Sequence, residues 1–239
     1  MKESNCQHSS DHQLFLNRQK FFTAIEQSDL VSLKSFIHHD SFDLRLKDFD
    51  GFNGLLRAVE SGNLSVFNLL VDCHLDIYVK EPMFGESVLH IASKLGHLSI
   101  VNRLVSLGFN LHLLSTHGDS ALHSASIYGH LPIVRRLLSL GLDPSLKNSS
   151  GYSPLHLAVR FNHLDLVDFF LNSACVSSII RDVNLCTPLH LAIQSSNVLM
   201  VSLFLNSPSF CFSDHSYDGG SLLHYLVPIF GIYDSLLPS

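Results

Sequence analysis

Histidine, a side chain that binds metals and transfers protons near neutral pH, occurs sixteen times in this chain of 239 residues. A metal site needs several such ligands converging on one ion. Eight of the histidines instead recur at regular intervals, which strings them out along the chain: His90, His97, His123, His130, His156, His163, His190 and His224. The others, such as His38, His39 and His117, show no ligand spacing. We therefore expect no metal ion and no other cofactor.

The side chains of hydrolytic triads are also abundant, so catalysis has to be considered. The sequence contains no nucleophile elbow, no phosphate-cradling glycine loop and no H-E-x-x-H pattern. Aspartates such as Asp43, Asp48 and Asp50 fall in one short polar stretch, where solvated turn residues are the simpler interpretation. Without a set of residues that could act together on a substrate, we predict that the chain is not an enzyme.

The composition argues against nucleic acid as a partner. Apolar residues make up 46% of the chain, enough for a core, and the formal net charge is −6 with no run of basic residues. Nucleic-acid binders usually concentrate Lys and Arg on one face, so we expect no nucleic-acid partner.

Features that report on cellular location favour the inside of a cell. The five cysteines form no C-x-x-C pair, and their odd number argues against a disulfide framework. The polar N-terminus lacks the apolar segment of a signal peptide. The most apolar stretch, residues 222–233, is shorter than the roughly 20 residues that span a bilayer. We expect a cytoplasmic protein, with the nucleus as the alternative, and no direct insertion into a membrane.

The spacing of the histidines comes from a repeated motif. The copies are SVLHIA, SALHSA, SPLHLA, TPLHLA and SLLHYL, beginning at residues 87, 120, 153, 187 and 221, and their histidines lie 33, 33, 34 and 34 residues apart. Two degenerate copies precede them, with Leu56 and Phe22 in the histidine position. Four residues after each alanine comes a pair such as Gly62-Asn63 or Gly96-His97, followed by apolar residues.

This pattern resembles the ankyrin repeat, with its 33-residue period and T-P-L-H-x-A signature, over about residues 20–227. The resemblance implies an all-α ankyrin-repeat solenoid of helix-turn-helix units with β-hairpin-like finger loops. It also implies that the motif imidazoles join loops and helix starts through hydrogen bonds. We divide the chain into a polar N-terminal tail (1–17), a domain of six to seven repeats with the first two and the last degenerate (18–227), and an apolar C-terminal tail or truncated repeat (228–239).

Local residue preferences support these helices independently. Hydroxyl side chains that can cap a helix open each motif copy: Ser87, Ser120, Ser153, Thr187 and Ser221. Pro154 and Pro188 follow at the first helical position, where a missing N–H costs nothing. Apolar residues then recur at helical spacing in a second helix: Leu98, Val101, Leu104 and Val105; Leu131, Val134, Leu137 and Leu138; Leu164, Val167 and Phe170.

Two places depart from the pattern. Leu185 stands where the other fingers have glycine and residues 173–180 hold an extra residue, so we expect an irregular fifth finger around 181–184. Pro228, four residues after His224, should break the first helix of a seventh repeat and leave an apolar end. That end belongs to a longer chain, folds back over the last repeat, or docks on a partner.

In ankyrin proteins partners usually dock on the finger tips and first helices. At those positions an aromatic and aliphatic strip runs across four repeats: Phe49, Phe52, Met83, Phe84, Leu95, Ile127, Tyr128, Tyr152 and Phe161. Charged residues border it, namely Glu60, Glu86, Lys94, Asp119 and Arg160, with His117 on the third finger. Large rigid side chains dominate interface energies, so we expect the strip to anchor an apolar helix or extended peptide. The alternative for each strip residue is packing between neighbouring fingers.

The sequence thus predicts a monomeric scaffold, adaptor or inhibitor, with self-association through the C-terminal tail as the alternative state. Other interpretations stay open: a targeting domain of a larger enzyme or membrane protein, or a bacterial effector that mimics a host adaptor. An inhibitor of Rel-type transcription factors is a further interpretation, although the chain has no acidic tail of the kind expected there.

Overall fold

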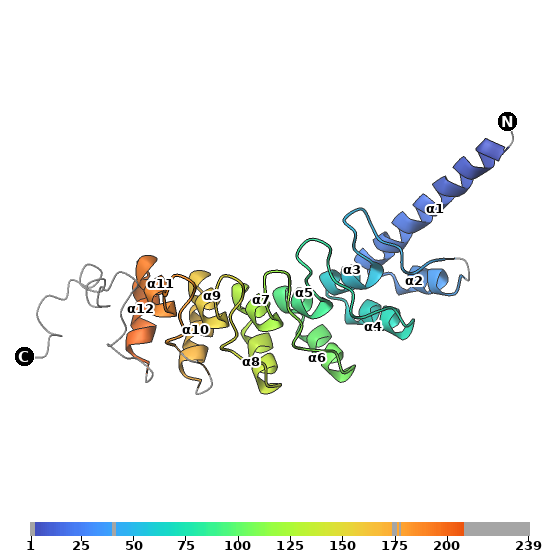
Figure 1. The fold of residues 1–239 in the computed structure, drawn as a ribbon. Coiled ribbons are helices and arrows are strands. Elements are labelled where there is room, and N and C mark those ends of the chain that lie inside the picture. The colour runs from blue at the N-terminus through green and yellow to red at the C-terminus, as the bar shows by residue number, and fades with distance from the viewer. Residues whose placement is uncertain (1–2, 40–41, 174–175, 177, 208–239) are drawn as a thin grey trace, which may run out of the picture. The chain divides into compact units, whose positions relative to one another are not determined.

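The computed structural model describes residues 3–39, 42–173, 176 and 178–207. The chain forms two compact units, Met1–Asn110 (unit 1) and Leu111–Ser239 (unit 2). Figure 1 shows that the described part of each unit is built from pairs of helices joined by loops, with α1 longer than the others. In the described residues the only β-pairing consists of isolated bridges, between Lys47 and Asn53 and between Lys80 and Ser87. The predicted all-α helical repeat fold is therefore confirmed.

Unit 1 holds three helix pairs: α1 (Glu3–Glu26) with α2 (Leu30–Ile37), α3 (Gly54–Ser61) with α4 (Leu64–Asp72), and α5 (Val88–Lys94) with α6 (Leu98–Ser106). Each first helix contacts the next first helix, α1 on α3 and α3 on α5, and α4 contacts α6. The unit thus has a layer of first helices and a layer of second helices, with apolar side chains such as Leu56, Val59 and Leu70 buried completely.

Unit 2 repeats the arrangement with α7 (Ala121–Ile127) and α8 (Leu131–Ser139), α9 (Pro154–Arg160) and α10 (Leu164–Leu171), and α11 (Pro188–Gln194) and α12 (Val198–Leu205). The first helices again contact one another in sequence, as do α10 and α12. The C-terminal segment 228–239 and the last motif copy, with Ser221 and His224, lie outside the described residues.

The segment predicted to be a polar tail, 1–17, is helical from residue 3 onward and continues without a break into the first repeat as α1. Phe21, Phe22, Ala24 and Ile25 are buried on the C-terminal part of this helix, and its assignment as the first degenerate repeat stays a prediction. The N-terminal part of α1 extends past α2 and α3 (Figure 1). Sequence reasoning missed this because the first half of α1 has no apolar stripe to mark a buried face.

The motif residues start the first helices as predicted. Ser87, Ser120, Ser153 and Thr187 each form a reciprocal capping box with the histidine three residues on. In α9, for example, the Ser153 backbone N–H donates to His156 Nδ1 at 3.1 Å, and the Ser153 hydroxyl lies 2.8 Å from the same nitrogen. Pro154 and Pro188 occupy the first turn of α9 and α11. The degenerate second repeat replaces the box with Asn53, whose side chain accepts the Leu56 N–H at 2.9 Å.

The second helices bury a slightly different stripe from the predicted one. Val101, Leu104, Val134, Leu137, Val167 and Phe170 are buried as expected. The leading leucines Leu98, Leu131 and Leu164 are only half-buried. Three positions not predicted, Ile100, Ile133 and Leu166, are buried instead. The buried face therefore includes the third residue of each helix in place of the first, a shift of only a fraction of a turn because two residues of each helix belong to both stripes.

Five finger loops precede the first helices from α3 onward, and one backbone hydrogen bond closes each. In four of them the bond joins residues four apart, as from Asp48 N–H to the Phe52 carbonyl at 2.8 Å and from Asn148 N–H to the Tyr152 carbonyl at 3.0 Å. The second finger spans one residue more, from Glu81 N–H to the Glu86 carbonyl at 2.8 Å. This extra residue accounts for the longer step between the second and third repeats.

The prediction of an irregular fifth finger is wrong for residues 181–186. Asp182 N–H donates to the Cys186 carbonyl at 2.9 Å, the same closure as in the first, third and fourth fingers. The buried Asp182 carboxylate also accepts the N–H groups of Asn184 and Cys186. Leu185 takes the left-handed backbone conformation, with φ +60°, that glycine takes elsewhere. These hydrogen bonds hold the turn despite the unfavourable side chain.

Candidate functional site

The residues predicted to bind a partner lie on the fingers, on the first helices or at the ends of those helices. Unit 1 carries Phe49, Phe52, Glu60, Met83, Phe84, Glu86, Lys94 and Leu95. Unit 2 carries His117, Asp119, Ile127, Tyr128, Tyr152, Arg160 and Phe161. We call the surface formed by fingers and first helices the finger face of each unit. Continuity of the strip from one unit to the other stays a prediction.

Most of the predicted apolar residues are open to solvent. Phe49 and Met83 are the most exposed, at 75% and 73%, and Phe84, Leu95, Tyr128 and Phe161 are each exposed by 40% or more. The other three, Phe52, Ile127 and Tyr152, are half-buried. Part of each of these three side chains is therefore packed against neighbouring groups. The role of each residue in binding stays a prediction.

A hollow of about 590 Å³ lies on the finger face of unit 1, between the first two fingers and helices α3 and α5. We call it the finger groove. Its apolar lining is Phe52, Pro82, Met83, Phe84, Ile91 and Leu95. Its charged lining is Asp50, Arg57, Glu60, Glu81, Glu86 and Lys94. Seven of the predicted residues thus line one hollow, namely Phe52, Glu60, Met83, Phe84, Glu86, Lys94 and Leu95. Its volume is typical of a small binding site.

A second hollow, of about 450 Å³, lies between the first finger and α1. Phe49 lines it, with its ring 6.0 Å from that of Phe15 and 5.0 Å from the Arg18 guanidinium carbon. Sequence reasoning missed Phe15 and Arg18 because both fall in the segment assigned to a tail or its border. The available signal was their spacing from Phe22, seven and four residues, which places all three on one side of a helix.

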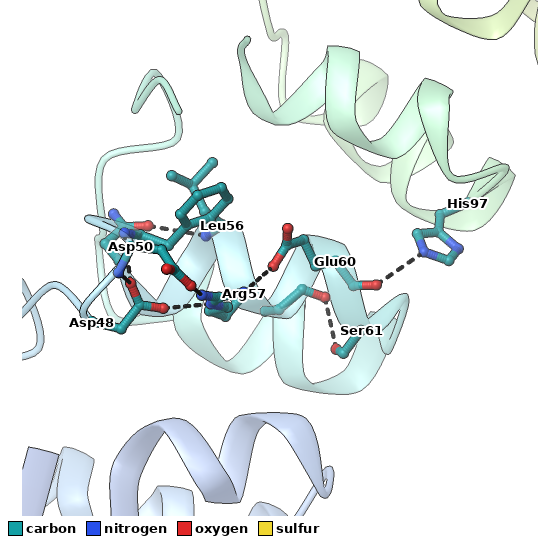
Figure 2. Close-up of polar contacts among 10 residues, drawn as sticks. Asp48, Asp50, Leu56, Arg57, Glu60, Ser61 and His97 are labelled. Carbon is teal, nitrogen blue, oxygen red and sulfur yellow. Dashed lines mark hydrogen bonds and ion pairs between the residues drawn. The ribbon is translucent and has the colours of Figure 1, made fainter. Parts of the chain in front are cut away.

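Arg57 lines both hollows, and the sequence analysis did not predict it as a site residue. Figure 2 shows its guanidinium between Asp48, Asp50 and Glu60, with ion pairs from Nε to Asp48, from Nη2 to Asp50, and from Nη1 to Glu60 at 2.8 Å. Its guanidinium carbon lies 4.7 Å from the centre of the Phe52 ring. Burial by itself would lower the pKa of Arg57, but the hydrogen bonds with Asp48 and Asp50 outweigh it and raise the pKa above its ordinary value.

The longer second finger is held by Glu81, a buried carboxylate. Its two oxygens accept the backbone N–H groups of Met83 and Phe84, each at 2.7 Å. At the base of the same finger, Glu86 and Lys94, both predicted as border charges, pair with each other at 3.3 Å. These contacts hold the base of the finger in place, while the Met83 side chain stays exposed at its tip.

The finger face of unit 2 is joined by polar contacts between fingers. Ser149 N–H donates to the His117 carbonyl at 2.8 Å, and the Asn148 amide donates to the Asp119 carboxylate at 2.8 Å. Arg160 Nη1 donates to the Tyr152 hydroxyl at 3.0 Å, and its guanidinium lies over the Tyr152 ring. Two predicted border charges, Asp119 and Arg160, thus also hold their own unit together.

The histidines join neighbouring repeats as the resemblance implied. In unit 2, His123 Nε2 lies 3.0 Å from the Tyr152 carbonyl and His156 Nε2 lies 3.1 Å from the Cys186 carbonyl, both in the following finger. The histidines just before the second helices reach the other way, since His163 Nε2 lies 2.7 Å from the carbonyl of Ile127 in the preceding repeat. In unit 1, His97 reaches back to the Glu60 carbonyl (Figure 2). Burial lowers the pKa of His156, which favours a neutral ring that donates from Nε2.

The described residues show neither a metal-ligand cluster nor a membrane-spanning helix. Among them, no three His, Cys, Asp or Glu side chains are grouped as metal ligands would be. No helix in the described ranges combines the length and the apolar character needed to cross a membrane. The polar side chains on the finger faces are engaged in ion pairs and loop hydrogen bonds, an arrangement suited to presenting a surface.

Comparison with known proteins agrees with the repeats seen in sequence and structure. A family model described as ankyrin repeats (3 copies) matches residues 55–148, 89–178 and 140–215. A comparison with curated proteins finds no match. The matched stretches overlap into a region of more than half of the chain, and within its described part lie the capped helix pairs from α3 to α12. This chain belongs to the ankyrin-repeat family.

Proposed function

We propose that this chain is a non-catalytic interaction module that binds a partner protein through its finger faces, as a scaffold, adaptor or inhibitor. Ankyrin repeats generally mediate protein–protein interaction, which gives the broad function. The observation that carries the finer proposal is the set of large apolar side chains left exposed on the fingers and first-helix ends: Phe49, Met83, Phe84, Leu95, Tyr128 and Phe161. Exposed side chains of this kind, bordered by charged groups, resemble the centre and rim of protein interfaces.

The test is a triple variant, Phe84→Ala, Tyr128→Ala and Phe161→Ala, used as bait in affinity purification with mass spectrometry. These side chains are exposed, so the variant should keep the wild-type melting temperature within a few degrees while losing the proteins that the wild type captures. The matched control is Val31→Ala, Val198→Ala and Leu199→Ala, which removes three exposed side chains from the second helices α2 and α12.

Two outcomes would count against the proposal. If the triple variant unfolds, the three side chains belong to the core. If the control loses the same partners as the triple variant while both stay folded, binding does not depend on the finger faces. The cytoplasmic location and the monomeric state expected from the sequence stay predictions.

A further inference from the structure

We infer that the finger groove of unit 1 binds an apolar segment that carries lysine or arginine next to its apolar anchor. This inference rests on the proposed function and adds the chemistry of the partner to it. It starts from the groove itself, whose volume is about 590 Å³ and whose lining combines apolar side chains with a surplus of carboxylates.

The apolar part of the groove offers an adaptable contact surface. Met83 stands at the tip of the only described finger with an extra residue, and Phe84 and Leu95 line the same hollow with 42% and 40% of their surface exposed. Because Glu81 fixes the backbone at Met83 and Phe84, the finger is ordered before a partner arrives. A preordered apolar surface loses little conformational freedom on binding, and methionine adjusts to the shape of its contact.

The charges around this surface select the sign of the partner. Arg57 is shared among three carboxylates, those of Asp48, Asp50 and Glu60. Lys94 pairs with Glu86, and the Glu81 carboxylate receives only backbone N–H groups among the contacts described above. The groove lining thus sets four carboxylates, those of Asp50, Glu60, Glu81 and Glu86, against two cations. A partner that brings Lys or Arg to this rim is attracted, and an acidic segment is repelled.

Glu60 and Asp50 are the groups best placed to meet such a cation. Asp50 has a side chain that is 69% exposed, and that of Glu60 is 34% exposed, although both contact Arg57. They flank the apolar lining on the side of α3 and the first finger, while Met83 and Leu95 lie on the side of the second finger and α5. A segment with a cationic residue close to an apolar one can therefore satisfy both sides of the groove at once.

The experiment pans a phage-displayed library of random 12-residue peptides against the full chain. The recovered peptides should be enriched in a large apolar residue within a few positions of Lys or Arg. The strongest of them is then synthesised with a fluorescent label, and its Kd is measured by anisotropy. Raising NaCl from 0.05 to 0.3 M should weaken the wild-type Kd by about threefold or more, because salt screens the rim charges.

Two double variants test the charged side and the apolar side of the groove separately. Asp50→Asn with Glu60→Gln removes two charges but keeps oxygen acceptors for Arg57. Each of these two substitutions should weaken the Kd by roughly two- to fivefold. Met83→Ala with Leu95→Ala should weaken it by about tenfold or more. The charge control, Asp165→Asn with Asp168→Asn on α10, should leave this Kd unchanged, and Tyr128→Ala with Phe161→Ala tests whether the peptide binds unit 2 instead. Circular dichroism confirms that each variant is folded, and the salt series tests the charge argument without any substitution.

Failure can be assigned to one proposal or the other. Peptides that are acidic or uncharged, or a Kd that survives the Met83 and Leu95 changes, would overturn the inference about this groove. Peptides whose binding depends only on Tyr128 and Phe161 would do the same and leave the proposed function intact. Recovery of no peptide above background would contradict both.

Discussion

The finger faces of the two units are built on the same helix pairs and the same turns, yet they present different surfaces. In unit 1 the first two fingers enclose hollows rimmed by carboxylates that share the single guanidinium of Arg57. In unit 2 the third and fourth fingers are joined by hydrogen bonds between backbone, amide and carboxylate groups, with Arg160 packed on Tyr152. The Ser–His box that starts α5 in unit 1 also starts α7 and α9 in unit 2, so the recognition properties of each unit come from side chains that the fold does not require.

The comparison predicts that changes in the shared framework act alike in both units. Leu70 on α4 and Phe170 on α10 occupy equivalent positions and are completely buried. Leu70→Ala should lower the free energy of unfolding by about 2–5 kcal/mol and Phe170→Ala by about 3–5 kcal/mol, through lost apolar contacts and a cavity. Urea titration followed by circular dichroism at 222 nm measures both. A loss below 1 kcal/mol in either unit would show that its second helices are not packed as described.

A second prediction exchanges a framework residue between units. His156→Leu places in unit 2 the residue type that unit 1 has at Leu56. The change should cost about 1–3 kcal/mol, because it removes the acceptor of the Ser153 N–H and the donor to the Cys186 carbonyl. Leu56 is tolerated because Asn53 caps α3 without a histidine. Adding Ser153→Asn to His156→Leu should recover part of the loss in the same urea titration, and no recovery would mean that the cap is not the cause.

The same histidine predicts how stability changes with pH. Burial lowers the pKa of His156 below its ordinary 6.5, so the unfolded chain binds a proton more readily than the folded one. The contribution of the neutral ring to the free energy of unfolding is therefore complete above pH 6.5, and it decreases as the pH falls below 6.5. Melting temperatures measured between pH 7.5 and 5 should fall less steeply for His156→Leu than for the wild type. The exposed His117→Gln is the control, and a wild-type slope in His156→Leu would exclude a contribution from this ring.

The smallest predicted effect concerns the turn at Leu185. Leu185→Gly should raise the free energy of unfolding by about 0.5–1 kcal/mol, because the left-handed conformation is costly for leucine and part of the gain is offset by the freer unfolded chain. The reverse change at the third finger, Gly118→Ala, should be destabilising, since the added Cβ would lie 3.1 Å from Ser149 N and Oγ. Equal stabilities for Leu185→Gly and wild type would mean that the turn is not strained.

The parts of the fold that follow from the sequence are those in which one residue meets the same neighbours in every repeat. Motif residues such as Ser153, Pro154 and His156 could be assigned to helix starts because repetition makes their role readable. Arg57 could not, since its three partners come from one finger and one helix and the set does not recur in the other repeats that the structure describes. The extension of α1 was also hidden, because its sequence has no apolar periodicity to mark a helix. The candidate site was predicted as a set of positions, but its hollows depend on finger length and side-chain pairing.

The opposed reach of the two kinds of histidine has a consequence for how unit 2 comes apart. Between the repeats of α7 and α9, His123 binds forward to Tyr152 while His163 binds backward to Ile127. If either repeat unfolded alone, a polar group in the other would lose its hydrogen-bond partner. A buried polar group without a partner costs free energy. The pair is therefore interlocked, and thermal fluctuations should release it as one block, keeping its display of side chains whole until the block is lost.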